Sequence, residues 1–438
     1  MWGNNKTWIN WLQFASIVLM SPFFLFPTLK LAWAVTAILA VILARLIIKD
    51  RPFERTPIDW GLGILSIQIL ATCFVVPDIE FSRPKIAGVV FGLLFYYALI
   101  KVLKSERILK SALFGYVGAG LALAIFGLLG MYRTGEPVFS RFLTDPPKHF
   151  PIVHWKLPGA EWGFNPNPLG GTLLLIVPVA VLLWYHYRDK SAGCIGGAVV
   201  VLTLAVVIFF TQSYGVWIAL FIGFWAAVLR ARWKRICLLS LALTIVAVIF
   251  MKGYKPSDLP KIAENNLIRT KIEGRYAYWE AALKAISRNP LFGVGMNRLR
   301  LDPRIGYERA HAHNQLLHTA AELGIPALVA YLTILIGAGW MCLEVYRKSD
   351  SEWMKVAARG LGTGQLAFFI FGLGDALPLG SKLGIFFWIS LALITSLYHY
   401  LVQNRIRKVE GYDPRRHRRA IAHDKSAAIY RFDPNRAR

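Results

Sequence analysis

Cysteine is scarce in this chain, and its few copies share no pairing pattern. Only 4 of the 438 residues are cysteine, namely Cys73, Cys194, Cys237 and Cys342. Each lies in an apolar block or at the edge of one, so none has the spacing of a zinc site or of a small disulfide-linked domain. The cysteines therefore predict core packing, and they exclude a disulfide scaffold and a cysteine-ligated metal.

Carboxylates are also few, with 25 Asp and Glu against 50 Lys and Arg and a formal net charge of +25. Such a surplus can indicate nucleic-acid binding. However, 56% of the chain is apolar, whereas a soluble domain has about 45 to 50%. The apolar residues form blocks of about 18 to 22, which are long enough to cross a bilayer and should be helical there. We predict an all-α polytopic membrane protein of about 12 transmembrane helices, with residues 1–402 as one membrane domain.

The order of apolar blocks and basic connections predicts the topology. The predicted spans are 8–27, 29–48, 59–76, 86–103, 109–131, 168–185, 193–210, 212–229, 236–252, 322–346, 357–376 and 384–402. The connections KDRPFER, KVLKSERILK, YRDK, RARWKR and YRKSDSEWMK are rich in Lys and Arg, so the positive-inside rule places them and both termini in the cytoplasm. Residues 8–27 run straight into the next span, so we expect no cleaved signal peptide.

The basic tail at 403–438 contains RIRK and RRHRR. A run of this kind next to a membrane span can bind nucleic acid, but it more often anchors to anionic membrane lipid. We predict the lipid anchor and no nucleic-acid partner.

Two outward connections are long, at 132–167 and 253–321. The second carries 11 Lys and Arg against 6 carboxylates. Topology does not require this excess on the outer side. Arginine matches phosphate bidentately and does not lose its charge, so the loop predicts a phosphate-bearing substrate.

An amphipathic helix is predicted in this loop, beginning after Gly274 and ending at Asn289 and Pro290. Its apolar positions recur at helical spacing at Tyr276, Trp279, Leu283 and Ile286. We expect the helix to lie on the membrane surface with its aromatic residues among the headgroups. Arg275 would stand at its N-terminal end, where the helix dipole also favours an anion; the alternative is a solvated or lipid-facing arginine.

Three histidines follow, at His311, His313 and His318. Zinc is disfavoured because the two residues of an H-x-H pair on a helix point about 200° apart, and no ligating carboxylate follows at the usual spacing. A histidine is a good general acid or base because its pKa lies near the operating pH. For His318 we favour a structural role at the end of a span.

These segments resemble the O-antigen ligase and polymerase superfamily over about 160–345. The resemblance rests on GRYAYWEAALKAISRNPLFGVG, and on His313 and Asn314 followed after nine residues by Gly324 and Ala327. FNPNPLGG and the turn TQSYG are similar to family segments too. The ligases commonly have arginine in that turn where this chain has Tyr214, which can still donate a hydrogen bond.

The resemblance implies a glycosyltransferase of the bacterial inner membrane with its active site on the periplasmic face. It would move a glycan from undecaprenyl diphosphate to an acceptor hydroxyl of lipid A-core type, inverting the anomeric centre without a metal or cofactor. His313 would be the base and Arg275 would hold the diphosphate, while His311 or Asn314 orients His313. The predicted substrate-binding set also contains Tyr214, Arg288, Arg298 and Arg300.

Several alternatives stay open at this stage. Within the superfamily they are an O-antigen polymerase and a protein O-oligosaccharyltransferase. Outside it they are a carrier of lipid-linked glycans and an envelope scaffold. A carrier places ionisable groups near the bilayer midplane, whereas here Asp375 and Gln365 are the main polar residues of the spans. The long loop with arginine and histidine favours the enzyme.

Overall fold

In a computed structural model of the protein, the described residues are 5–25, 31–47, 50–129, 132–133, 136–137, 165–189, 191–228, 266–301 and 311–409. Their helices are α1 (Asn5–Leu25), α2 (Leu31–Ile47), α3 (Asp59–Val75), α4 (Ile79–Val102), α5 (Glu106–Leu129), α6 (Pro166–Leu173), α7 (Val177–Tyr187), α8 (Ser191–Thr211), α9 (Tyr214–Val228), α12 (Asn266–Arg288), α13 (Gln315–Leu323), α14 (Ile325–Lys348), α15 (Glu352–Gly372) and α16 (Ile385–Val409). Two 3-10 turns, η3 (Leu299–Leu301) and η4 (Lys382–Gly384), accompany them. Strands β1 (Tyr132–Arg133) and β2 (Glu136–Pro137) form one short antiparallel pair.

The predicted helical class is confirmed. Among the described residues, six segments are long and apolar enough to cross a membrane, namely Ile79–Val102, Glu106–Leu129, Pro166–Tyr187, Gly193–Thr211, Ile325–Lys348 and Lys382–Ile406. Every predicted span within the described residues coincides with a helix, or with the pair α6 and α7, to within several residues. The span predicted over 236–252 and the tail from 410 lie outside the described residues. The count of twelve spans stays a prediction.

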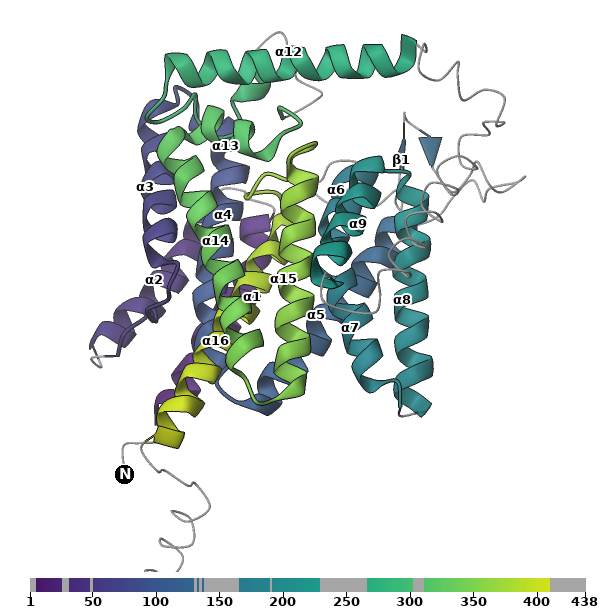
Figure 1. The fold of residues 1–438 in the computed structure, drawn as a ribbon. Helices are drawn as coiled ribbons and strands as arrows, with labels where there is room; N and C mark the ends of the chain where they lie inside the picture. The colour runs from purple at the N-terminus through teal and green to yellow at the C-terminus, as the bar shows by residue number, and fades with distance from the viewer. Residues whose placement is uncertain are drawn as a thin grey trace, which may run out of the picture.

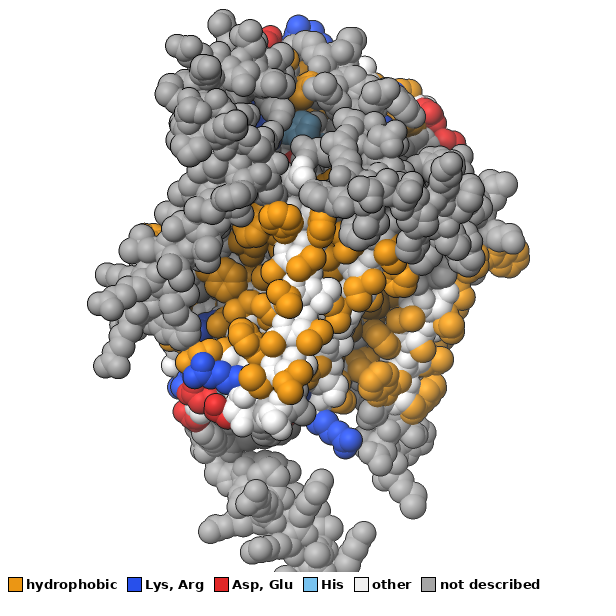
Figure 2. Space-filling view, turned by 90° about the vertical axis from the view of Figure 1, so that its right-hand side faces the viewer, with side chains coloured by type: hydrophobic (Ala, Val, Ile, Leu, Met, Phe, Trp, Pro, Cys, Tyr) orange, Lys and Arg blue, Asp and Glu red, His pale blue; other side chains and the backbone are white. Residues whose placement is uncertain are grey.

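The helices form a bundle in which α15 is central, because it packs against α7, α9 and α14 (Figure 1). The core includes large, fully buried side chains such as Trp388, Tyr331 and Phe387. Apolar side chains also cover the outside of the bundle, and Figure 2 shows them as a broad band across the middle of one face. Phe74 and Trp60 are 89% and 84% exposed. Exposed apolar surface of this extent suits contact with lipid.

Helix α12 lies across one end of the bundle and not along it (Figure 1). The prediction of a helix ending at Arg288 is confirmed, but its predicted start is wrong because α12 already begins at Asn266. Arg275 therefore stands in the third turn. The dipole effect falls off within the first turn of a helix, so the predicted dipole contribution at Arg275 is lost.

The face of α12 that packs on the protein differs from the predicted apolar stripe. The buried residues are Tyr278, Ala281, Ala282 and Ala285, which form a small core with Leu299, Ala312 and Ala321. Alanine lets two backbones approach closely, so these positions make the contact. Tyr276 and Leu283 are 64% and 55% exposed. That outward face is available for the predicted headgroup contact.

Close packing of α4 on α16 gives a testable stability effect. A β-carbon added at Gly92 would lie 2.2 Å from the Trp388 ring, whereas one at Gly63 would meet nothing within 4 Å. We expect Gly92→Ala to destabilise the protein by about 1 to 3 kcal/mol through overpacking. The matched Gly63→Ala variant should be neutral or slightly stabilising. Thermal unfolding of both purified variants in detergent measures the difference, and equal midpoints would contradict the packing described for Gly92.

Candidate functional site

The start of α13 is fixed to the end of α15 by one asparagine. The Asn314 side chain caps α13 by accepting hydrogen bonds from the backbone amides of Leu316 and Leu317, both at 3.0 Å. Its amide nitrogen also donates to the Leu373 carbonyl at 3.1 Å. An N-cap of this type stabilises a helix by about 0.5 to 2 kcal/mol. Asn314 therefore sets the position of the preceding residue, His313, relative to the segment after α15.

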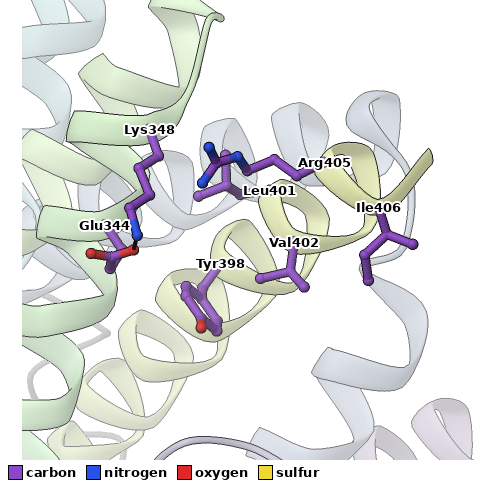
Figure 3. A pocket seen from close by; sticks show the side chains of 7 residues that line it. All are labelled: Glu344, Lys348, Tyr398, Leu401, Val402, Arg405 and Ile406. Atoms are coloured by element: carbon purple, nitrogen blue, oxygen red, sulfur yellow. Dashed lines mark ion pairs between the residues drawn. The ribbon is translucent and has the colours of Figure 1, made fainter. Parts of the chain in front are cut away.

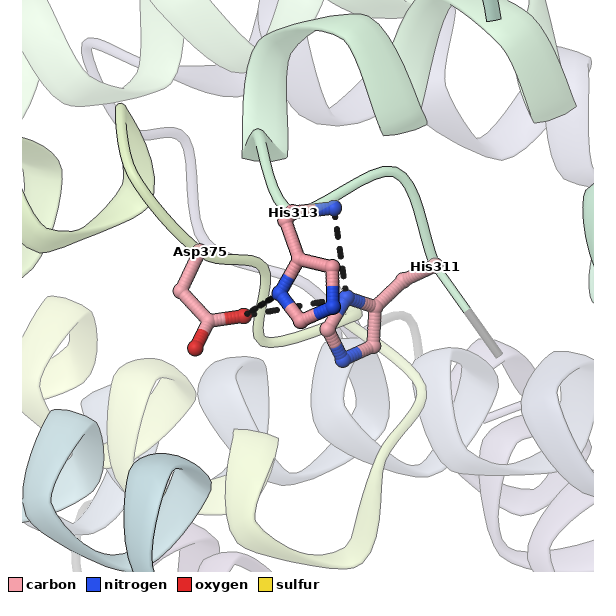
Figure 4. Close-up of side chains that lie close together, drawn as sticks. All are labelled: His311, His313 and Asp375. Atoms are coloured by element: carbon pink, nitrogen blue, oxygen red, sulfur yellow. Dashed lines mark hydrogen bonds and ion pairs between the residues drawn. The ribbon is translucent and has the colours of Figure 1, made fainter. Parts of the chain in front are cut away.

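His313 faces a buried carboxylate supplied by that segment. Its Nδ1 lies 3.0 Å from Oδ1 of Asp375 (Figure 4). His313 adopts φ of +48°, a left-handed conformation that costs free energy for a residue other than glycine and that is often retained at functional sites. The positive φ lies in the turn between His311 and α13, and this turn brings the His313 ring to Asp375.

Asp375 is held by its own surroundings. Its side chain is only 8% exposed, and Oδ1 also accepts a hydrogen bond from the Ala376 amide at 2.8 Å. Burial acts most strongly on the Asp375 pKa and raises it, but the hydrogen bonds from His313 and from the Ala376 amide oppose burial, and the net effect lowers the pKa. Asp375 is therefore ionised at neutral pH and can accept a hydrogen bond from a protonated Nδ1 of His313.

His311 supports this arrangement as a neutral ring. Its Nδ1 accepts a hydrogen bond from the His313 backbone amide at 3.4 Å, and the two rings meet edge to face with centroids 4.5 Å apart. Burial lowers the pKa of His311 to about 3, against the opposing charge of Asp375. His311 thus contacts the His313 backbone directly, whereas Asn314 binds the Leu373 carbonyl. That either residue orients His313 stays a prediction.

Helix α12 brings two further side chains to the pair. Tyr278 is buried, and its ring centroid lies 5.6 Å from that of His313. A β-carbon built on Gly374 would lie 3.8 Å from Nη1 of Arg275. The exposed Arg275 guanidinium therefore sits beside the residue that precedes Asp375. The segments around Arg275 and His313 therefore lie together, as predicted from the sequence.

Tyr214 lies at the start of α9 and is 39% exposed. A β-carbon at the following Gly215 would lie 3.4 Å from the Phe371 ring. Phe371 belongs to the last turn of α15 and accepts backbone hydrogen bonds from Gly374 and Asp375. The turn that carries Tyr214 is therefore at the same end of α15 as the His313–Asp375 pair.

The other predicted arginines lie elsewhere. Arg288 is thirteen residues from Arg275 on α12, which places their Cα atoms about 20 Å apart. Arg298 donates to the Asp78 carbonyl at 3.5 Å, and the Arg300 guanidinium lies over the Phe81 ring. The described contacts of Arg298 and Arg300 are thus with the beginning of α4. Their assignment to the substrate-binding set stays a prediction.

His318 forms a separate buried pair. Its Nε2 lies 3.4 Å from Oε2 of Glu322, and both side chains are at most 5% exposed. Burial lowers the pKa of His318 to about 3 and raises that of Glu322 to about 7. Glu322 also accepts a hydrogen bond from the Leu299 amide. Glu322 thereby connects α13 to the first residue of η3, which fits the structural role expected for His318.

His311 and His313 do not have the helical geometry on which a zinc site was disfavoured. His311 and His313 precede α13 and are not on a helix, and Asp375 supplies the missing carboxylate from 62 residues away. The ligand atoms of these three residues lie within 4.8 Å of one another, so the group could hold a metal ion. Asp375 was noted in the sequence only as a polar span residue. An ionisable residue in an apolar segment is itself a functional signal. This signal identifies Asp375 as a candidate site residue.

The family model described as O-antigen ligase matches residues 198–332. No curated protein matches the chain. The matched region contains Arg275, His311 and His313, and it ends before Asp375. The predicted resemblance to the O-antigen ligase superfamily is thereby confirmed, and the apolar helices together with the match indicate a membrane glycosyltransferase of the ligase and polymerase type.

Proposed function

We propose that this chain, whose residues 198–332 match the O-antigen ligase family, transfers a glycan from undecaprenyl diphosphate to an acceptor hydroxyl at the end of the bundle covered by α12. The single observation that carries the proposal is the His313–Asp375 pair with Arg275 beside it. The base, the group that orients the base and a cation for the leaving group thus lie together. That end faces the periplasm in the predicted topology.

The reaction needs one proton acceptor and one site for developing negative charge. The acceptor oxygen attacks the anomeric carbon, the bond from this carbon to the diphosphate oxygen breaks, and the lipid diphosphate leaves with the bonding electrons. Because Nδ1 of His313 is engaged with Asp375, Nε2 takes the hydroxyl proton. A general base contributes about 10² to 10⁴-fold, and correct positioning of two substrates can contribute roughly 7 to 11 kcal/mol. Direct displacement inverts the anomeric centre.

Arg275 stabilises the diphosphate in this scheme. We expect Arg275→Ala to weaken donor binding by about 1.5 to 3 kcal/mol, the cost of losing a charged hydrogen bond. Arg275→Lys keeps the charge but not the planar fork, so it should recover only part of the affinity. Donor affinity is measured directly with a labelled polyprenyl-diphosphate glycan. Lys284→Ala removes an exposed charge from the same helix and serves as the control; an equal loss in both variants would count against a specific role for Arg275.

The side of the membrane is tested by cysteine labelling. In a variant without the four native cysteines, Lys284→Cys on α12 and Asp189→Cys beyond α7 place single thiols at opposite ends of the bundle (Figure 1). An impermeant thiol reagent should label position 284 in intact cells and position 189 only after lysis. The reverse pattern would move the proposed site to the cytoplasmic side.

Transfer itself is tested with purified protein and a polyprenyl-diphosphate glycan. A lipid A-core acceptor, a second donor molecule and a peptide are offered in separate reactions, which distinguish a ligase from a polymerase and a protein glycosyltransferase. We propose lipid A-core as the acceptor and a metal-independent reaction that survives excess chelator. Loss of activity on chelation with rescue by one divalent ion would instead assign His311, His313 and Asp375 to a metal.

A carrier of lipid-linked glycans is the competing class. Carriers place ionisable groups at the bilayer midplane. Asp375 lies after the end of α15 and beside α13, and the buried Gln365 amide nitrogen donates a hydrogen bond to the Ser390 hydroxyl at 3.0 Å. Movement of the donor across vesicle membranes without formation of a glycosidic bond would favour the carrier over the enzyme.

A further inference from the structure

The end of the bundle opposite α12 contains two cavities, one on each side of the last turns of α16. The larger has a volume of about 610 Å³ and lies between α16 and the connection from α2 to α3. The smaller, of about 460 Å³, lies between α16 and α14 (Figure 3). Tyr398 and Val402 line both. The two cavities therefore adjoin at these two residues of α16.

The larger cavity carries a surplus of positive charge. Its two carboxylates are already paired: Asp50 with Arg45 at 2.5 Å and with Lys101 at 3.8 Å, and Glu54 with Lys104. Arg51 and Arg55 line the same cavity, are exposed, and make no ion pair among the described residues. The lining itself has three cations, Arg51, Arg55 and Lys101, against these two carboxylates, which gives a formal charge of +1, and Arg45 and Lys104 pair with the carboxylates from outside the lining. The carboxylates are thus unavailable to neutralise Arg51 and Arg55.

The smaller cavity joins this charge to an apolar surface. Leu401, Val402 and Ile406 line it, and Ile406 is 50% exposed. Its carboxylate, Glu344, is paired with Lys348, which leaves Arg405 as the cation beside the apolar wall (Figure 3). A cationic cavity next to an apolar groove suits an amphiphile with an anionic head. Free phosphate would use only the cationic part.

We propose that this pair of cavities binds the phosphate headgroup of an anionic phospholipid through Arg51 and Arg55, with an acyl chain against Leu401, Val402 and Ile406. The guanidinium fork matches phosphate oxygens bidentately. Basic pockets between membrane helices on the cytoplasmic side are a known form of headgroup site. The proposed site lies at the other end of the bundle from the His313–Asp375 pair, and it includes Arg405 and Ile406 from the start of the basic tail.

The test uses the full chain purified in detergent and fluorescent phosphatidylglycerol as the probe. We expect Arg51→Gln with Arg55→Gln to weaken binding by about 25-fold, since one basic residue near an anionic surface is worth about 1 kcal/mol, or about fivefold. Arg107→Gln removes another exposed arginine at this end of the bundle, outside both cavities, and should bind like the parent. Elution volume and thermal midpoint confirm that the variants are folded.

Three results would overturn the proposal. Unchanged phosphatidylglycerol affinity in the folded double variant would remove Arg51 and Arg55 from any such site. Equal binding of phosphatidylcholine would show that the headgroup charge is not recognised. Competition by inorganic phosphate at the concentrations at which phosphatidylglycerol competes would assign the cavity to a soluble anion.

Discussion

Replacing His313 should slow single-turnover transfer by about two to four decades while donor affinity stays near the parent value, because a general base acts on the chemical step. Alanine at this position is strained, since φ is +48°. His313→Asn is the sharper variant because asparagine tolerates the left-handed region better than most residues. It can still hydrogen-bond to Asp375 but cannot take up the hydroxyl proton.

Donor affinity and single-turnover rate are measured separately on folded protein. His186→Asn, in the last turn of α7, is the matched control and should keep the parent rate. Near-normal turnover in His313→Asn would remove the general base from the mechanism, and the cluster would then be a binding surface.

Asp375→Asn should have the second-largest effect, a loss of about 10² to 10⁴-fold in turnover. In a serine protease triad, the same change leaves the geometry intact but favours the wrong histidine tautomer, at a cost of about 10⁴-fold. Asp375 accepts from Nδ1 of His313, so the amide would weaken the bond that directs Nε2 to the substrate. The control is Asp189→Asn, because that side chain is 94% exposed.

The pH profile separates this role from simple packing. The Asp375 pKa is lowered, so the parent carboxylate loses its charge only below the usual range of a carboxyl group, and the acid limb of its activity should reflect another group. An Asp375→Asn variant with a reduced rate at every pH fits a positioning carboxylate. A folded variant with parent rate and parent profile would show that His313 does not need Asp375.

Local patterns in the sequence predicted the helices well. Apolar blocks determine span-forming segments because hydrocarbon allows no unpaired backbone, and the signal is contained in each block. The predicted start of α12 was wrong because Gly274 lies inside the helix, which begins at Asn266. The alanines form the face of α12 that packs on the protein. The sequence alone does not predict this face, because small side chains allow close packing only where a neighbouring segment lies against them.

The site was predictable only in part, since its pieces come from separate segments. Arg275 and His313 stand in the matched region, and each has a recognisable local pattern. Asp375 does not, because its pairing depends on the contact between α13 and the end of α15. The loop conformation of His311 and His313 was also inaccessible, since the helical geometry assumed for them does not apply to a turn with positive φ.

The tie from Asn314 to the carbonyl of Leu373 has a consequence for building chimeric enzymes. An exchange between relatives that followed the matched boundaries, 198–332, would transplant the histidine and leave the acidic partner and its anchoring carbonyl in the recipient. In such a hybrid, the contact would form only if the start of α13 from one protein fitted the end of α15 from the other. Extending the exchange through residue 377 would carry both sides of the junction as one transferable unit.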